Sequence, residues 1–470
     1  MLDWTVDKMS IKAKYIGDRQ FYKKTLGVAV PIMIQNGITN FVGLLDNIMV
    51  GQVGTEQMSG IAIVNQLLMV FNLAIFGAIS GAGIFTAQYY GAGDNEGVRN
   101  TFRFKMYICI GLTAVGIIVL SFFGENLIRM YLQGEGNGLS VEDALFYGKK
   151  YLRIMLIGLI PFAVEQSYSG TLRECGETTV SMRAGIAAVA VNLGLNYLLI
   201  FGKFGFPKLG VEGAAIATVI SRYVQVAIVI IWTHTHKERM PFIKGAYRKP
   251  VVPRALTGQI IMRGAPLMIN EVMWAAGIAG LSQCYSMRGL DAVAAINISS
   301  TITNLFNVVF IAFGDAIAIV VGQLLGAERY DEAKDTDRKL ITFSVLICFV
   351  IGGVLAVSAP LFPKLYRTTD SVRLLAGSIM RISAAFMPVY AFMHAAYFTL
   401  RSGGKTIVTF LFDSVFLWLI SVPVAFVISR YTGMPLLLLY FCIQALDLIK
   451  CAVGFVLVKK GVWINKIVRN

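Results

Sequence analysis

Apolar runs of about 20 residues or more recur along the whole chain, and each can cross a hydrocarbon layer about 30 Å thick as an α-helix. Inside lipid every backbone polar group needs a partner within the protein, so only helices and closed barrels span a membrane. Uninterrupted apolar runs lack the alternating pattern of barrel strands. The sequence therefore predicts an all-α integral membrane protein.

The composition agrees with this class of protein. Of the 470 residues, 56% are hydrophobic and only 15% are charged, whereas about a quarter of an ordinary soluble chain is charged. The net charge of +15 comes from short basic clusters between the apolar runs. This scatter does not indicate nucleic-acid binding, which would need a basic patch on one domain. The six cysteines show no CxxC spacing, so neither a disulfide framework nor a zinc site is indicated.

Charged or Gly/Pro-rich breaks divide the chain into twelve expected transmembrane helices. The spans are 26–50, 57–90, 102–124, 151–172, 178–201 and 211–233, then 264–286, 292–325, 340–362, 378–400, 406–429 and 434–458. The first run is too long for a cleaved signal peptide, so it should stay in the membrane. Most Lys and Arg residues fall on the side of the amino terminus, which predicts that both termini are cytoplasmic.

The second half of the sequence repeats the first. Pro31 matches Pro266 and Gln88 matches Gln323 at the same separation, and TLRECGET (171–178) corresponds to TLRSGGKT (399–406). Since six spans return the chain to its starting side, the copies should be parallel and related by a pseudo-twofold axis along the membrane normal. We therefore expect an N-terminal six-helix lobe (1–234), a cytoplasmic basic linker (235–257) and a C-terminal six-helix lobe (258–470).

Several motifs, in their order along the chain, resemble the multidrug and toxic compound extrusion (MATE) family. They are DNIMVGQVG (46–54), GAISGAGIFTAQYYGAGD (77–94), TLRECGET (171–178), NLGLNYLLIFG (192–202) and GVEGAAIAT (210–218). The resemblance runs from about residue 22 to 460. It implies a bacterial antiporter of the cytoplasmic membrane that exports organic cations in exchange for H⁺ or Na⁺.

The resemblance assigns a role to Asp46, which lies about five residues inside the end of its span, roughly 7 Å at 1.5 Å per residue. In the family, an acidic residue at this place faces the cavity of the amino-terminal lobe and takes part in cation coupling. Desolvation favours the protonated form of a carboxylate, so such a group could take up a proton outside and release it inside. The alternative is an interfacial aspartate held by water.

Asn192, Asn196 and Thr218 resemble the polar cluster that the family builds beside this acid. Asn192 and Asn196 are four residues apart and share a helix face. The resemblance implies an ion-coupling site of Asp46 with these three residues, and a Na⁺ ion would bind at Asp46 and Asn192. Interhelical hydrogen bonding is the alternative, and Asn196 stands where some members carry an acid.

In the second half, Glu271 and His394 are candidates for a polar substrate site. Glu271 lies less than two turns after Pro266, near the register of a carboxylate that some family members use, and the alternative is a pair with Arg263. His394 stands six residues after Pro388, where some members carry an aspartate. An intramembrane histidine can titrate near neutral pH, although a structural role is the alternative.

Other ionisable residues also fall within spans: Asp315, Asp413, Glu165 and Arg222. Such groups pair with one another or face an internal cavity, and Glu165 with Arg222 is the pair that the sequence suggests. Asp447, three residues before Lys450, is expected to form a surface ion pair with it.

The sequence thus predicts a monomeric antiporter in a bacterial inner membrane, with no cofactor other than its coupling ion. The alternative is a flippase for lipid-linked saccharides. Such proteins often have a strongly cationic cavity, whereas this chain has only Arg222 clearly in mid-span. An enzyme is not expected, because the three histidines form no HExxH motif. A channel is disfavoured because no filter motif is present.

Overall fold

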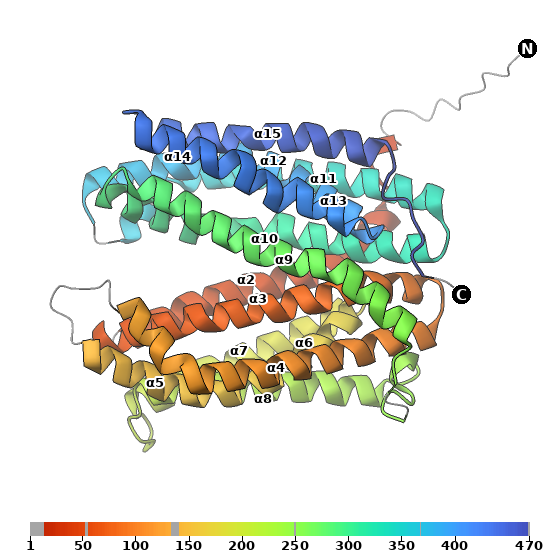
Figure 1. Cartoon of the computed structure of the whole chain (residues 1–470), viewed down its shortest axis with the longest axis horizontal. Helices are drawn as coiled ribbons and strands as arrows, with labels where there is room; N and C mark the ends of the chain where they lie inside the picture. The colour runs from red at the N-terminus through yellow and green to blue at the C-terminus, as the bar shows by residue number, and fades with distance from the viewer. Residues whose placement is uncertain (1–13, 52–54, 133–140, 249–250, 367, 469–470) are drawn as a thin grey trace, which may run out of the picture. The chain divides into compact units, whose positions relative to one another are not determined.

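The computed structural model describes residues 14–51, 55–132, 141–248, 251–366 and 368–468, and Figure 1 labels their helices. No strand occurs among these residues. Six helical rods come before the linker: α2 (Arg19–Gly51), α3 (Thr55–Gly91), α4 (Asn95–Leu132), α5 with α6 (Val141–Ile157 and Leu159–Glu174), α7 (Thr178–Phe201) and α8 (Val211–Thr235). The rods agree in number and order with the six spans expected there, and most extend beyond the predicted bounds.

Six further rods follow the linker. They are α9 (Arg254–Ser286), α10 (Leu290–Gly326), α11 (Tyr330–Ser358), α12 (Asp370–Ser402), a composite rod over residues 406–431, and α15 (Leu436–Lys459). The composite rod consists of α13 (Thr406–Phe410), two π-helical segments η3 (Leu411–Val415) and η4 (Leu417–Ser421), and α14 (Val422–Tyr431). The twelve-helix, all-α fold predicted from the sequence is therefore confirmed.

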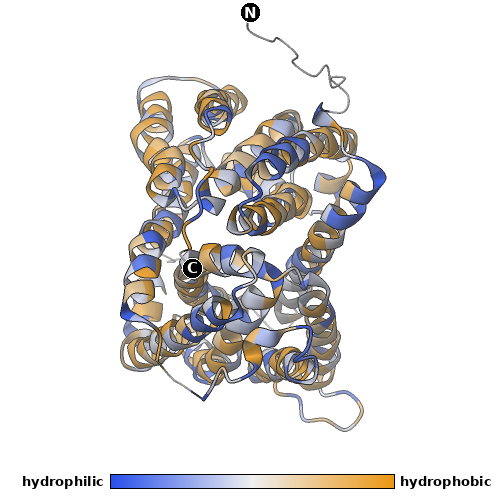
Figure 2. Cartoon of the chain, turned by 90° about the vertical axis from the view of Figure 1, so that its right-hand side faces the viewer, coloured by the Kyte–Doolittle hydropathy of each residue, from blue (hydrophilic) through white to orange (hydrophobic). Residues whose placement is uncertain are grey.

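Nine of the described helical segments are long and apolar enough to cross a membrane by length and composition. Neither α5 nor α6 reaches such a length alone, because the rod is interrupted at Gly158. Hydrophobic residues predominate along the helices in Figure 2. This distribution is typical of helices that are solvated by lipid.

The chain divides into two compact units, which we describe separately. One unit is Ile34–Val272, and the other combines Met1–Met33 with Met273–Asn470. Both boundaries fall inside a helix, α2 in the first case and α9 in the second. In the unit that includes Met273–Asn470, Ile32 of α2 packs with Ala312 and Ile319 of α10. This packing explains why the start of α2 belongs to that unit.

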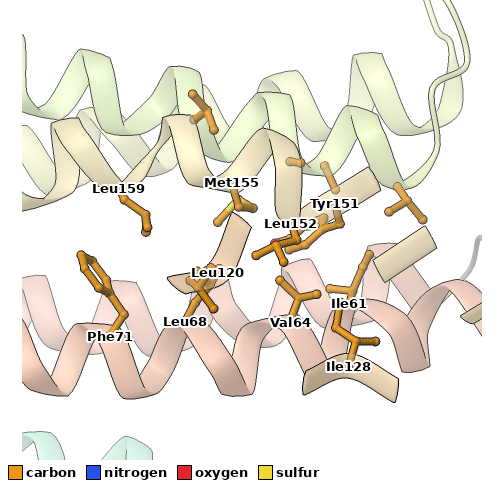
Figure 3. Packing of buried hydrophobic residues seen from close by; sticks show 14 of the residues in the cluster. Ile61, Val64, Leu68, Phe71, Leu120, Ile128, Tyr151, Leu152, Met155 and Leu159 are labelled. Carbon is orange, nitrogen blue, oxygen red and sulfur yellow. The ribbon is translucent and has the colours of Figure 1, made fainter. Parts of the chain in front are cut away.

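The core of unit Ile34–Val272 is an apolar cluster between α3, α4, α5, α6 and the neighbouring helices. Figure 3 shows side chains of this cluster directed toward one another: Ile61, Val64, Leu68, Phe71, Leu120, Ile128, Tyr151, Leu152, Met155 and Leu159. The α3 members recur every three or four residues, so they form one stripe of that helix. The stripe fixes which face of α3 turns inward.

Glycines of the GAISGAG segment (77–83) allow close helix contacts. A Cβ atom added to Gly81 would lie 2.4 Å from the Cα of Gly264 on α9, and one added to Gly77 would lie 2.8 Å from the Cα of Met268. Small residues let backbones approach in this way inside membranes. The motif is therefore a helix-packing surface between α3 and the start of α9.

The described part of the linker is folded onto α4. Its 3₁₀ turn η1 (Pro241–Ile243) buries Phe242 and Ile243. Arg99 donates to the Phe242 carbonyl oxygen over 3.0 Å, and Arg103 donates to the carbonyl oxygens of Ala246 and Gly245 over 2.7 and 2.9 Å. Basic residues of α4 therefore attach the linker to unit Ile34–Val272.

Candidate functional site

Asp46 lies on helix α2, but its side chain lies outside what the structure describes. The helix places it five residues before Gly51, at the end of α2 remote from the amino terminus. The role of Asp46 in ion coupling stays a prediction.

Asn192, Asn196 and Thr218 form one hydrogen-bonded row between α7 and α8. Asn196 Nδ2 donates to Asn192 Oδ1 over 3.1 Å, and Asn192 Nδ2 donates to Thr218 Oγ1 over 3.3 Å. Thr218 Oγ1 in turn donates to the carbonyl oxygen of Ala214, 3.0 Å away. The two asparagines are 5% and 1% exposed. The structure therefore brings together three of the four residues of the predicted coupling site.

The turn between α7 and α8 explains how these side chains meet. Gly202 ends α7 with φ 66°, a left-handed conformation that glycine adopts at low cost. A Cβ atom at Gly213 would lie 2.7 Å from the backbone of Leu199, so only glycine permits this approach of the two helices. Each amide or hydroxyl oxygen of the row has two lone pairs. Oxygens of this kind can accept a further hydrogen bond or ligate a hard cation.

The expected pair of Glu165 with Arg222 does not form, which corrects that prediction. Arg222 Nη1 donates to the Gly158 carbonyl oxygen over 3.1 Å, and its guanidinium lies 5.1 Å from the centroid of the Phe162 ring. Glu165, 3% exposed, instead accepts hydrogen bonds from Ser169 Oγ at 2.5 Å and Gln166 Nε2 at 3.0 Å. The break at Gly158 supplies a carbonyl that competes for the arginine.

Glu271 is half-buried on α9 and follows the buried Asn270. It belongs to unit Ile34–Val272, whereas His394 belongs to the other unit. Arg263, one possible partner considered from the sequence, has its guanidinium 5.9 Å from the centroid of the Phe85 ring. The substrate-binding role of Glu271 and His394 stays a prediction.

His394 is half-buried on α12 between aromatic rings. Its ring centroid lies 4.7 Å from that of Phe310 and 6.4 Å from that of Phe398. Its Nδ1 atom is buried and has no hydrogen-bond partner among the described residues. A buried ring nitrogen without a partner is costly, so this histidine is unlike an ordinary structural histidine with satisfied hydrogen bonds.

Lys450 pairs with Asp413, and not with Asp447 as the sequence suggested. The Lys450 Nζ to Asp413 Oδ1 distance is 3.0 Å, and the two side chains are 11% and 21% exposed. No ion pair joins Asp447 to Lys450 among the described residues. Because Asp413 lies in the π-helical segment η3, no local spacing rule predicts its contact with α15.

Lys105 and Asp337 are among the buried charged residues that were not singled out from the sequence. Lys105 on α4 is fully buried, forms an ion pair with Glu174 of α6, and donates to Thr171 Oγ1 over 3.3 Å. Gly83 of α3 makes room for this carboxylate, because a Cβ atom there would collide with it. Both charged residues stand near expected span ends, where charges are ordinary, so only the packing reveals the burial.

Asp337 on α11 is 1% exposed and accepts a hydrogen bond from Thr399 Oγ1 over 2.5 Å. No Lys or Arg forms an ion pair with it within the part of the chain described by the structure. In the sequence, Asp337 lies just before the expected span 340–362, at a position where a helix end exposed to solvent would be expected. The α12 helix covers it instead.

Comparisons with known proteins identify relatives of this chain among membrane transporters. The MatE family profile matches residues 31–198 and 266–427. A probable multidrug resistance protein NorM of Thermotoga maritima is 26% identical over 417 residues, covering 88% of this chain and 87% of the relative. A probable multidrug resistance protein YoeA of Bacillus subtilis is 24% identical and covers 87% of both chains.

Solved structures share the fold. An outward-facing multidrug resistance MATE family transporter matches with a TM-score of 0.85 and 20% identity, over 95% of this chain and 97% of that one. A MOP superfamily transporter from Pyrococcus furiosus matches with a TM-score of 0.81 and 19% identity over the same shares. At such low identity these likenesses establish the arrangement of the helices and leave the substrate open.

Proposed function

The chain belongs to the MATE family of transporters, and from this premise we propose that it exports small organic cations in exchange for H⁺ or Na⁺. A multidrug efflux antiporter is the function that the curated relatives support. The proposal includes a bacterial inner membrane, cytoplasmic termini and a monomer. It also includes two six-helix lobes, 1–234 and 258–470, joined by the linker.

The ion-coupling part rests on the hydrogen-bonded row Asn192–Asn196–Thr218, in which both asparagines are buried. Hydrogen bonds join these two asparagines of α7 to each other and to the threonine of α8. Their oxygens offer neutral ligands or hydrogen-bond acceptors, and the proposal adds the carboxylate of Asp46 as the charged member. A Na⁺ ion would bind at Asp46 and Asn192, whereas a proton would reside on Asp46.

Coupling requires that the ion and the drug discriminate between the states of the protein. A ligand with equal affinity for both states shifts nothing. We infer that an organic cation and the coupling ion compete for Asp46, since both are attracted by the same negative charge. Ion uptake from outside then displaces the drug, and ion release to the cytoplasm restores the drug-binding form.

A flippase for lipid-linked saccharides is not favoured. The two curated relatives described above are named probable multidrug resistance proteins. Arg222, the mid-span cation that such a substrate would require, is engaged by the Gly158 carbonyl oxygen and the Phe162 ring.

The experiment uses the full chain in proteoliposomes with ethidium and tetraphenylphosphonium as probe cations. A pH gradient and a Na⁺ gradient are imposed separately, and probe movement is recorded. We expect one of the two gradients to drive probe transport, with movement of the coupling ion in the opposite direction. If neither gradient moves either cation while a lipid-linked saccharide crosses the bilayer, the antiporter proposal is wrong.

A further inference from the structure

The unit that contains residues 273–470 holds a mixed-charge cluster, which we call the α15 cluster: Asp413, Lys450, Asp447 and His394. Its centre is the ion pair between Lys450 on α15 and Asp413 on η3, with 3.0 Å between Nζ and Oδ1. Lys450 is 9% exposed. None of the coupling residues Asp46, Asn192, Asn196 or Thr218 belongs to the cluster.

Aromatic rings surround the ammonium group. The Nζ atom of Lys450 lies 5.6 Å from the ring centroid of Phe412 and 5.7 Å from that of Phe416, both within the range of cation–π attraction. These rings flank Asp413 on the π-helical rod. The ion pair therefore lies next to apolar aromatic side chains, where an uncompensated charge would be costly.

Asp447 gives Lys450 a second potential partner. It lies three residues earlier on the same helix, a spacing that lets side chains meet on one face. Asp447 interacts electrostatically with both Lys450 and Asp413. Lys450 thus has one carboxylate across the helix interface and another on its own helix.

His394 completes the cluster from α12. Asp413 and Lys450 are the charged groups that act electrostatically on its ring. Its Nδ1 atom has no hydrogen-bond partner within the described ranges. The buried Nδ1 atom of this half-buried ring can thus accept or donate a proton.

Phenols and one thiol also lie around the cluster. Tyr390 of α12 hydrogen-bonds to Gln444, and Tyr440 of α15 lies 2.9 Å from Ser383 Oγ. Tyr285 of α9 and Cys451 of α15 complete this set. Phenols are ordinarily neutral below a pH of about 10. The charge of the cluster at neutral pH therefore depends on Asp413, Asp447, Lys450 and His394.

Counting these charges points to a proton. Two ionised carboxylates, one ammonium and a neutral imidazole carry a net charge of −1. One added proton makes the cluster neutral, whichever group receives it. Neutral clusters are preferred inside membrane proteins, where ionisable residues pair with one another.

The irregular rod supplies an element that can respond. π-Helical turns are rare and occur often at functional sites. Here η3 and η4 precede Pro423, which has no N–H group to donate to the preceding turn. Asp413 lies on η3, so the ion pair with Lys450 fastens this irregular segment to α15.

We propose that the α15 cluster binds one exchangeable proton, and that the proton switches Lys450 from Asp413 to Asp447. The proton comes from water and adds to a carboxylate oxygen of Asp413, directly or through His394. Lys450 then pairs with Asp447 on its own helix, and the contact between η3 and α15 is released. Deprotonation to water restores the original pair. The use of this proton in transport rests on the proposed antiport function, whereas its binding does not.

The test is pH-difference infrared spectroscopy of the purified full chain. This method detects the C=O stretch of a protonated carboxyl group and the ring bands of imidazolium. We expect the wild type to show a protonation band that Asp413→Asn loses, because Lys450 and Asp447 alone are neutral without a proton. Asp447→Asn should lose it for the same reason. The matched control is Asp331→Asn, whose side chain is 99% exposed in the same unit.

Lys450→Met and Lys450→Arg test the switch itself. Removing the ammonium leaves two neighbouring carboxylates, so the protonation band should persist to higher pH in Lys450→Met, while Lys450→Arg should resemble the wild type. Size-exclusion profiles identify variants that do not fold, and the arginine variant keeps the test valid if the methionine variant fails. Identical difference spectra for the control and the Asp413→Asn/Asp447→Asn double variant would overturn the proposal. That outcome is independent of whether an ion gradient drives efflux.

Discussion

Each half of the chain places a buried charged side chain beside the threonine of the repeated TLR motif, a lysine in the first half and an aspartate in the second. In the first half, Lys105 of α4 is paired with Glu174 of α6 and lies beside Thr171. In the second, Asp337 of α11 accepts a hydrogen bond from Thr399 of α12. The two threonines match in the repeated TLR motif, so the duplicated scaffold keeps the hydroxyl and changes the charge beside it.

Threonine can serve beside either charge, so the repeat can diverge here without losing its fold. A hydroxyl can accept from an ammonium or donate to a carboxylate, so threonine suits either sign of charge. The first site is a charge-balanced ion pair, whereas the second holds a carboxylate by a hydrogen bond. We therefore expect the first site to depend on its charge and the second to depend on its hydrogen bond.

The largest expected effect is that of Lys105→Met. Removing one partner of a buried pair leaves an uncompensated charge, at a cost of about 3 kcal/mol or more. We expect a clear loss of thermal stability for the purified protein in detergent. The double variant Lys105→Met/Glu174→Gln should recover most of that loss. Unchanged melting of Lys105→Met would mean that the first site does not depend on its ion pair.

Asp337→Asn should have a much smaller effect, because asparagine keeps an oxygen for Thr399 and removes the buried charge. We expect the free energy of unfolding to fall by no more than about 1 kcal/mol, or to rise, and the melting temperature to change accordingly. Asp337→Ala, which removes the acceptor, is the matched control and should melt lower. If Asp337→Asn lost as much thermal stability as Lys105→Met, the proposed difference between the two sites would be wrong.

The threonines give the smallest and sharpest comparison. Thr399→Val removes the hydroxyl bonded to Asp337 and should cost about 1–3 kcal/mol. Thr171→Val should cost about 1 kcal/mol or less, because Lys105 retains Glu174. Paired melting curves of the two variants check the order. The reverse order would show that the hydroxyl matters more beside the ammonium.

Much of the fold follows from local patterns. Long apolar runs predict the helices, and the matches of Pro31 with Pro266, of Gln88 with Gln323 and of the two TLR segments predict the repeat. The spacing of Asn192 and Asn196 also predicts one helix face, and Thr218 meets them because the α7–α8 turn is tight. These features depend on periodicity and turn chemistry, which a sequence displays directly.

The ion pairs were predicted less well, because pairing across helices depends on how each helix is rotated. Glu165 and Arg222 lie in neighbouring helices but find nearer partners. Lys450 bonds to Asp413 across the interface although Asp447 is closer in sequence. Asp413 is positioned by π-helical turns, and the only sequence feature that we associate with these turns is Pro423, which follows them.

Ion coupling at Asp46 is tested by ion-driven efflux in proteoliposomes, with Asp46→Asn measured beside the wild type and the Asp331→Asn control. We expect Asp46→Asn to insert at the wild-type level, yet to transport ethidium at background rates under the gradient that drives the wild type. Asparagine has nearly the same shape but neither binds a proton nor carries charge, so coupling should stop. Wild-type efflux by Asp46→Asn would contradict the account.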